Sequence, residues 1–429
     1  MSTRSYHKLD QAVPPAPAGC PMDAQFSPFS DAYVADPYAE LLPRRTETPV
    51  FYSEELNMVV VTRMDDIVEV FTNPETYSSE NVQDPVFPLT PETVEVLSTP
   101  DFNPVAVMSN RQEPDHKRIR QYTKKGFSNR RMKVLEPYIR QRSHELIDEL
   151  IASGSPADFA QAFAVPLPGD TVFRFIGFPE EHDDQLRAWC GERLAFSWGH
   201  PTPEQQLDIA TKMLAYWRYC REFTANKAAN MGDDFASELL ADHEENPDDL
   251  SYREVESIIY GLSFAGHEPV TLLLLNSLLC LLPRRDNWAE LVADPSLIPG
   301  ALEEVIRYES PQIGWRRVAN HDTTLGGIEI PKGTKIMLAL GAANHQPDIF
   351  EDPTTFDIHR TNSRNNISFG KGIHYCLGAK FARFEAKVAM EVLVERLPSL
   401  RLAGGQGELD RVPNISFRGP TSLLVEWDD

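Results

Sequence analysis

Apolar positions recur at helical spacing over most of the chain, and patterns typical of strands are confined to short stretches. A β-hairpin is predicted at 49–63 (PVFYSEELNMVVVTR), and short strands are predicted at 316–319, 334–340 and 423–427. Helices are expected at residues 28–44, 65–71, 134–151, 169–176, 179–196, 203–231, 250–282 and 379–397. The pattern therefore predicts a mainly α protein with small β-sheets.

Five stretches lack a sustained period and are expected to be loops, turns or linkers. Residues 72–110 contain six prolines, and a loop of this length inside a compact protein is commonly functional. The other four are a turn at 196–198, an acidic solvated linker at 242–249, a β-turn system at 326–333 and a hairpin tip at 413–420.

The hydropathy pattern does not indicate a membrane protein. The most apolar run, 270–282, is too short to span a bilayer and is interrupted by three polar residues, Thr271, Asn276 and Ser277. Residues 1–27 are polar and rich in proline at their start and lack the apolar core of a signal peptide, so we expect a disordered N-terminal arm. The expected location is cytoplasmic, without contact to a membrane.

Composition and charge narrow the range of partners. The chain is 41% hydrophobic and 24% charged, as in an ordinary soluble protein with a large core, and by its 429 residues alone it could hold two or three domains. Its net charge of −23 disfavours non-specific binding to nucleic acid or to an anionic membrane surface. Residues 117–133 nevertheless carry eight basic residues and no acidic one, which suggests a docking patch.

The five cysteines show neither metal-type nor disulfide-type spacing, which suits a reducing compartment. One of them, Cys376, lies in the glycine-rich stretch FGKGIHYCLG just before a helix. Gly370 and Gly372 permit a tight loop whose backbone N–H groups can turn toward the sulfur. The following helix adds its positive end, so we expect a lowered pKa and a thiolate able to hold a metal. Gly378 is a poor helix residue unless something flat, such as a porphyrin, presses against it.

For a lone Cys-x-Gly, a glycine-rich turn beside a buried structural cysteine would be the favoured interpretation. The longer pattern Phe-x-x-Gly-x-x-x-Cys-x-Gly, formed by Phe369, Gly372, Cys376 and Gly378, resembles the heme-binding loop of the cytochrome P450 family. The resemblance implies heme b, with Cys376 as the axial thiolate ligand of the iron, Phe369 over the sulfur and His374 near a heme propionate. A thiolate ligand favours O–O cleavage.

The resemblance extends over about residues 28–427, with the family's motifs in their usual order. It implies the α-rich triangular prism of the family and one heme-thiolate monooxygenase domain over 28–429. The N-terminal hairpin and the tail SFRGPTSLLVEWDD look closest to heme domains of the self-sufficient, reductase-fused branch and its stand-alone relatives. No flavin or iron–sulfur motif follows residue 427, so electrons are expected from a ferredoxin or flavodoxin and its reductase.

His116 and Arg120 stand four residues apart at the start of a helix and hence on one face. Such a pair is usually solvated, but here it resembles the family's clamp on the heme propionates. Arg317, in the strand at 316–319, resembles a further propionate partner.

The segment Phe264-Ala265-Gly266-His267-Glu268-Pro269 resembles the family's oxygen-binding segment, Ala-Gly-x-(acid)-Thr. The resemblance implies that Ala265 borders the heme, that Gly266 leaves a notch for dioxygen and that Glu268 is the acid. Pro269 replaces the usual threonine, which removes a hydroxyl and frees the carbonyl of Ala265. Protons would then arrive through Glu268, with His267 and water as helpers.

Glu304 and Arg307, with Arg360 further on, match the family's Glu-x-x-Arg motif and its arginine partner. An acid and a base three apart are a weak signal alone. The resemblance implies a structural network that supports the loop of Cys376.

Substrate contacts are expected in the stretch 72–110, near 196–198, on the central helix, just before the strand at 316–319 and at the hairpin tip. For each position, plain packing is an alternative. The candidates are Phe87, Val107, Trp198, Leu262, Ile313, Trp315 and Phe417, with Val86 and Met108 as weaker ones.

The expected activity is insertion of one oxygen atom from dioxygen into a small, mostly apolar substrate, for which an aromatic compound is favoured, by hydroxylation or O-dealkylation. Because Pro269 removes a catalytic hydroxyl, a hydrogen-peroxide-driven peroxygenase at the same heme is the alternative. A non-catalytic heme sensor or carrier is a third hypothesis, although no output module is visible.

Overall fold

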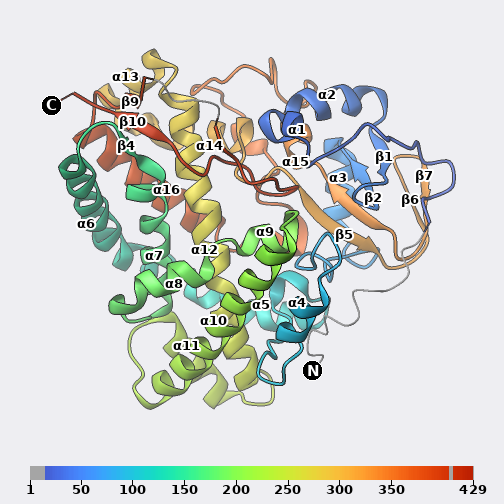
Figure 1. Cartoon of the computed structure of the whole chain (residues 1–429), viewed down its shortest axis with the longest axis horizontal. Coiled ribbons are helices and arrows are strands. Elements are labelled where there is room, and N and C mark those ends of the chain that lie inside the picture. Colours follow the sequence, from blue (N-terminus) through green and yellow to red (C-terminus); the bar gives the residue numbers. More distant parts are fainter. Residues whose placement is uncertain (1–14, 405–408, 429) are drawn as a thin grey trace.

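The computed structural model describes residues 15–404 and 409–428. A long helix, α12 (Tyr252–Leu281), runs through the middle of the molecule, with most helices on one side and the largest sheet on the other (Figure 1). Ser251 and Glu254 form a capping box at its start, and most of its side chains are buried. The helix therefore forms the core on which the other elements pack.

The remaining α-helices surround α12 and the sheet. In chain order they are α1 Asp31–Ala35, α2 Pro37–Glu47, α3 Met64–Thr72, α4 Pro91–Leu97, α5 Asp115–Gly126, α6 Asn129–Ser153, α7 Pro166–Ile176, α8 Asp183–Cys190, α9 Arg193–Trp198, α10 Pro203–Ala229, α11 Phe235–Glu245, α13 Arg285–Ala293, α14 Ile298–Tyr308, α15 Leu340–Ala343 and α16 Ala379–Arg396.

The largest sheet has five strands in the order β1-β2-β8-β5-β3: β1 Val50–Ser53, β2 Met58–Val61, β8 Lys335–Leu338, β5 Trp315–Ala319 and β3 Tyr77–Ser78. A three-stranded sheet joins β4 Ala157–Asp158, β10 Leu424–Glu426 and β9 Arg401–Leu402, and β6 Thr323–Leu325 pairs with β7 Ile328–Ile330. The mainly α class with small sheets is confirmed, as are the predicted hairpin at β1 and β2 and the long central helix.

Several predicted boundaries are wrong, each for a local reason. The single helix expected at 28–44 is two, because Asp36 ends α1 and caps α2, where Pro37 occupies the first turn. The helix expected at 179–196 is also two, broken at Glu192, which has a positive φ of 66°. The expected turn at 196–198 is consequently the last turn of α9.

The expected long loop and the expected N-terminal arm are more ordered than predicted. Residues 72–110 contain α4, which starts at Thr90 with a side-chain cap and proline at its first position. Residues 15–27 pack against the hairpin: Tyr52 exchanges backbone hydrogen bonds with Pro21 and Asp23, and Phe26 is buried. The disordered arm predicted for 1–27 is therefore wrong for this part, and residues 1–14 lie outside the described residues.

The acidic stretch 242–249 is not a free linker either, because its first half belongs to α11. Asp242 pairs with Lys125, and Asp249 accepts a hydrogen bond from Tyr122. Of the described helices, α12 is the one long and apolar enough to cross a membrane, and it is mostly buried inside the protein.

Candidate active site

A cavity of about 340 Å³ lies between α12 and the loop that carries Cys376. Its lining is mostly apolar, and it brings together residues predicted from separate motifs. Those lining residues are Arg120, Ala265, Gly266, Pro269, Arg317, Phe369, His374, Cys376 and Gly378. We take this cavity as the candidate active site.

The loop before α16 has the tight geometry that its glycines predict. Gly370 and Gly372 both have φ of +70°, and a Cβ at Gly372 would collide with the backbone oxygen of Phe71. The backbone N–H of Cys376 donates to the carbonyl of Phe369 at 2.9 Å. A Cβ added at Gly378 would lie 4.0 Å from the Cys376 sulfur, so the glycine leaves space on the cavity side.

Cys376 is exposed to the cavity, but the protein around its sulfur excludes enough water to raise the pKa of the thiol above its usual value. The backbone N–H groups of Gly378 and Ala379 and two nearby guanidiniums oppose this shift without cancelling it. The prediction of a lowered pKa is therefore wrong for the thiol itself. A coordinated metal deprotonates a thiol, so the thiolate forms with release of a proton when the metal binds.

Four basic side chains gather at one rim of the cavity: His116, Arg120, Arg317 and His374. The two imidazole rings lie 4.2 Å apart, and Nε2 of His116 is buried without a hydrogen-bond partner among the described residues. Burial lowers the pKa of Arg317 to about 9, and burial together with the charge of Arg317 lowers that of His374 to about 3. Arg120 and Arg317 form no ion pair within the described chain. This rim therefore suits a bound group that carries carboxylates.

On the opposite wall, the middle of α12 presents Ala265 and Pro269 to the cavity. Gly266 also lines it, but a Cβ at this position would lie 2.6 Å from Cγ2 of Val172 on α7. The glycine is thus required by the packing of α12 against α7. The notch expected for dioxygen is not the sole reason for a glycine here.

His267 points away from the cavity, which corrects its predicted place in the site. Its Nε2 donates to the carbonyl of Val165 at 2.9 Å, and its ring packs against Phe173 on α7. Burial lowers the pKa of His267 to about 4, so the ring is neutral at physiological pH. The residue joins two helices and cannot pass a proton into the cavity from this position.

Glu268 lies beside the cavity and not in its wall. Its Oε2 accepts a hydrogen bond from the backbone N–H of Leu194 at 3.3 Å, at the start of α9. Burial raises the pKa of Glu268 to about 8, against the opposing effects of the Leu194 N–H and of Arg193. A carboxyl group that holds its proton at neutral pH is suited to donate one, provided that it can reach the cavity.

The predicted substrate contacts are largely found together. Val107, Trp198, Leu262, Trp315 and Phe417 line the cavity, as does Met108. Trp198 stacks on Trp315 with ring centroids 5.6 Å apart, and Phe417 packs edge-on against Trp198 at 5.2 Å. These rings, which come from α9, β5 and the C-terminal segment, form an aromatic wall.

Two predicted contacts, Phe87 and Ile313, do not line the cavity. Phe87 stacks on His200 at 4.0 Å and contacts Phe29. Ile313 is buried in the core beside the sheet, and its N–H donates to Ser416. The weaker candidate Val86 also lies outside.

Sequence reasoning missed Arg193, Tyr260 and Phe264, which line the cavity. The two aromatic residues stand four apart on α12, on the approach to Pro269, and this spacing could have indicated them. Arg193 precedes an expected turn, where nothing in the sequence marks it as buried.

Glu304, Arg307 and Arg360 form a buried network below the cavity. Arg307 donates two hydrogen bonds to Glu304 at 2.7 and 2.8 Å, and Arg360 adds one at 3.2 Å. Burial alone would raise the pKa of Glu304. The hydrogen bonds that the carboxylate accepts, of which those from Arg307 have the largest effect, hold this pKa below its usual range. Arg307 also donates to the carbonyl of Asn344, whose side chain bonds Ile367 N–H and Ser368 just before the cysteine loop.

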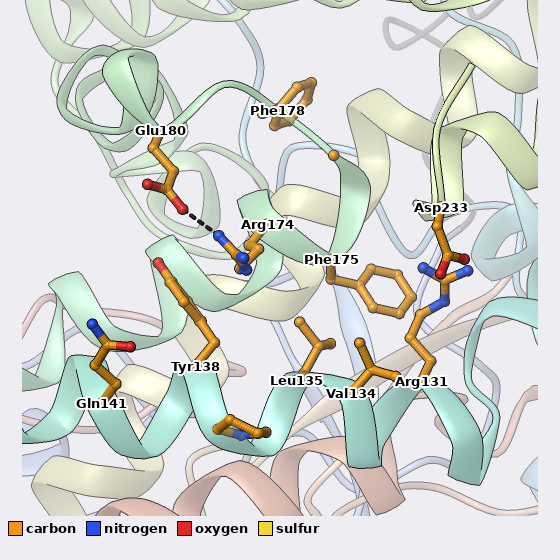
Figure 2. Close-up of a pocket in the computed structure, with 12 residues that line it drawn as sticks. Arg131, Val134, Leu135, Tyr138, Gln141, Arg174, Phe175, Phe178, Glu180 and Asp233 are labelled. Carbon is orange, nitrogen blue, oxygen red and sulfur yellow. Dashed lines mark hydrogen bonds and ion pairs between the residues drawn. The ribbon is translucent and has the colours of Figure 1, made fainter.

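A second pocket, of about 500 Å³, lies between α6 and α7 (Figure 2). Arg174 is ion-paired with Glu180 there and lies over the ring of Tyr138 at 4.4 Å. None of the predicted site residues lines it. Because Arg174 is already ion-paired, we assign no function to this second pocket.

Comparisons with known proteins show the family to which the chain belongs. The family model for cytochrome P450 matches residues 284–401. Cytochrome P450 107B1 of Saccharopolyspora erythraea is 34% identical over 403 residues, which cover 92% of this chain and 96% of that protein. The chain belongs to the cytochrome P450 family.

Solved P450 structures have the same fold. The cytochrome P450 CREJ in complex with (4-ethylphenyl) dihydrogen phosphate is 35% identical, with a TM-score of 0.89 over 94% of this chain and 99% of that one. An intact type IV self-sufficient cytochrome P450 monooxygenase is 34% identical, with a TM-score of 0.92 over 96% of this chain and 54% of that one. This P450 is thus a monooxygenase with heme b and a cysteine thiolate ligand, and the fold implies the family's use of dioxygen and a redox partner.

The residues of the cavity fit the heme. Cys376 provides the sulfur, Gly378 leaves space beside it, and the basic rim lacks the negative charge that two propionates supply. When bound, the heme supplies the binding and activation of dioxygen.

Proposed function

We propose that this P450 inserts one oxygen atom into a small, mostly apolar substrate with an aromatic ring, by hydroxylation or O-dealkylation. The observation that carries the proposal is the apolar cavity beside Cys376, with its wall of Trp198, Trp315 and Phe417. Aromatic side chains favour aromatic ligands through offset or edge-to-face packing. The aromatic ligand of the CREJ structure supports the same class.

We also propose that Glu268 delivers protons to the cavity, in place of the threonine that Pro269 replaces. In the structure its carboxyl group is bound to the N–H of Leu194, so delivery requires either a side-chain rotation or an intervening water. Ala265 lines the cavity, and its carbonyl, which Pro269 leaves without the usual helix donor, could accept a hydrogen bond from that water. His267 has no part in this route.

Electrons come from a ferredoxin or flavodoxin and its reductase in this proposal, through a basic docking face. Of the basic residues at 117–133, Arg118, Lys125 and Arg131 are ion-paired with acidic residues of α11 and α12. Arg383, near the cysteine, is likewise paired with Glu303. The remaining exposed cations of this docking face have no ion pair within residues 15–404 and 409–428: Lys117, Lys124, Arg130, Lys133, Lys371 and Lys380.

A peroxygenase remains the second candidate, because Pro269 removes the hydroxyl that normally serves dioxygen activation. In that reaction Glu268 would act as the acid–base group for peroxide. The exposed cations without an ion pair near the cysteine loop favour the reductant-driven reaction, since a peroxide-driven enzyme needs no docking face for a redox partner.

The deciding experiment measures product formed from methoxy- and alkyl-benzenes by the wild type, Glu268→Gln and Pro269→Thr. Each protein is tested with reductant and redox partner, and separately with hydrogen peroxide alone. We expect Glu268→Gln to lower product per reductant about a hundredfold, and Pro269→Thr to retain or improve it. Equal rates with peroxide alone would establish the peroxygenase, and an unaffected Glu268→Gln would remove Glu268 from the mechanism.

A further inference from the structure

Arg193 is a buried cation in the wall of the cavity. It is the first residue of α9, and only 7% of it is exposed. Its Nη1 donates to the hydroxyl of Ser197 at 2.6 Å, and its guanidinium lies 5.4 Å from the ring centre of Phe196 and 5.8 Å from that of Phe264. Nε and Nη2 make no hydrogen bond to the described chain, so they are free to bind a ligand.

No acidic residue within the described ranges forms an ion pair with Arg193. Two other buried arginines of this P450 differ in this respect: Arg307 pairs with Glu304 at 2.7 Å, and Arg418 pairs with Glu309 at 2.6 Å. Arg45 and Arg317 are also buried without an ion pair in the described chain, but Arg317 faces the rim that suits the heme propionates and Arg45 donates to the carbonyl of Ala342 away from the cavity. Leaving a guanidinium buried without a counter-charge is costly, and such groups are normally paired. Arg193 therefore lacks a partner that the rest of the fold supplies elsewhere.

The carboxyl group of Glu268, whose pKa is affected by the charge of Arg193, does not fill this role. Glu268 binds the N–H of Leu194 and forms no ion pair with Arg193 within 4.0 Å. Because its pKa is raised to about 8, it is mostly uncharged at neutral pH. It cannot fully neutralise the guanidinium.

The charged residues of the whole cavity also indicate that Arg193 lacks a negatively charged partner. Three arginines line it, Arg120, Arg193 and Arg317, and no acidic residue does. Arg120 and Arg317 lie with His374 at the rim that fits the heme propionates. Arg193, on α9, belongs to the wall that holds the predicted substrate contacts, together with Trp198.

We propose that Arg193 binds an anionic group of the substrate, so that the preferred substrates are small aromatic acids whose carboxylate or phosphate pairs with this guanidinium. The inference rests on the proposed function and specifies its substrate class. The planar fork of an arginine matches both oxyanions in a bidentate manner, and Nε and Nη2 form such a fork. The ring of the substrate would then lie along the apolar wall, toward Cys376.

The test uses the heme-loaded enzyme and binding measured by the spin-state shift and by calorimetry. The ligands are 4-ethylbenzoate and 4-ethylphenylphosphonate, which are anionic, and 4-ethylbenzamide, which is neutral and of the same shape as the benzoate. The variants are Arg193→Met and Arg193→Lys. The control is Lys212→Met, which removes a neighbouring cation that is paired with Glu192 and does not line the cavity.

We expect the wild type to bind the anions at least tenfold more tightly than the amide. Arg193→Met should weaken the anions by about 10- to 100-fold and leave the amide within threefold, because a hydrogen-bonded charge pair is lost. Arg193→Lys should retain most of the preference, and Lys212→Met should retain all of it.

Equal affinity of the wild type for benzoate and amide would overturn the inference and leave the proposed aromatic class standing. An equal loss of both ligands in Arg193→Met would also overturn it, because the residue would then only shape the cavity. If the wild type binds none of the three compounds, the aromatic class fails and the inference fails with it.

Discussion

Two groups of buried charges in this P450 differ in how completely they are paired. In the network of Glu304, Arg307 and Arg360, the carboxylate accepts hydrogen bonds from both arginines, from Ser363 and from a backbone N–H. Along the cavity, by contrast, Arg193 and Arg317 have no acidic partner among the residues described. The first group is complete without any ligand, and the second is not.

The difference separates residues that hold the fold from residues that bind something. A buried charge that is already paired gives information about the stability of the fold and not about a ligand, because removing either partner leaves the other one buried and unsatisfied. An unpaired buried charge that faces a cavity indicates what the cavity takes up. In this P450 the unpaired charged side chains that line the cavity are cations, which fits the heme propionates and the anionic substrate group that we propose for Arg193.

The largest expected effect is at the sulfur. In Cys376→Ser the thiolate ligand is lost, so the reduced, carbon monoxide-bound protein should lack the red-shifted Soret band of thiolate ligation, and monooxygenase activity should disappear. Absorption spectroscopy of the reduced protein measures this directly. Retention of the band would show that another residue ligates the iron.

Matched substitutions at Arg307 and Arg317 test the comparison itself. Arg307→Met leaves the Glu304 carboxylate buried without the two hydrogen bonds that Arg307 donates. We therefore expect the free energy of unfolding to fall by about 3–5 kcal/mol. Arg317→Met removes a cation without an acidic partner, so the stability of the heme-free protein should change little while heme is lost faster. Denaturant unfolding and heme transfer to an acceptor protein measure the two effects, and similar unfolding losses in both variants would contradict the distinction.

A smaller effect is expected at Glu385 on α16, a fully buried carboxyl group with no basic partner in the described chain. Burial raises its pKa to about 8, against a small opposing effect of Thr171. The protonated form is thus favoured by folding, and stability falls as the pH rises from about 4.5, the unfolded value, to about 8. Glu385→Gln should therefore stabilise the protein by roughly 1–4 kcal/mol at pH 8 and hardly at all at pH 4.5. A pH-independent difference would show that the carboxyl group is not neutral in the folded protein.

The smallest expected effect concerns the docking face. Lys124 is exposed and without an ion pair in the described residues, whereas Lys125 is already paired with Asp242. Lys124→Glu should slow electron transfer from an acidic partner several-fold at low ionic strength, and the effect should vanish in high salt. Lys125→Glu is the matched variant and carries an additional stability cost from repulsion with Asp242. Rates that do not depend on salt would exclude electrostatic docking here.

The sequence predicted those parts of the site that local spacing determines. The loop of Cys376, the central helix and the Glu304 network follow from glycines, caps and residue types at short separations. The directions of His267 and Glu268 did not follow, because neighbouring positions on one helix face different elements, here α7 and α9. Phe87 was misjudged and Arg193 was missed for a related reason. Burial of a loop residue, or of the first residue of a short helix, depends on contacts with distant segments, here His200 and Phe264.

The aromatic wall has a consequence for changing the substrate range by mutation. Its three rings come from segments that are tied together, since Ile415 N–H donates to the carbonyl of Trp198 and Ile313 N–H donates to that of Ser416. Contacting positions show strong coupling of mutational effects. Mutant libraries that vary Trp198, Trp315 and Phe417 one at a time will therefore record mostly losses, and new specificities should arise from combined replacements that repack the wall as a unit.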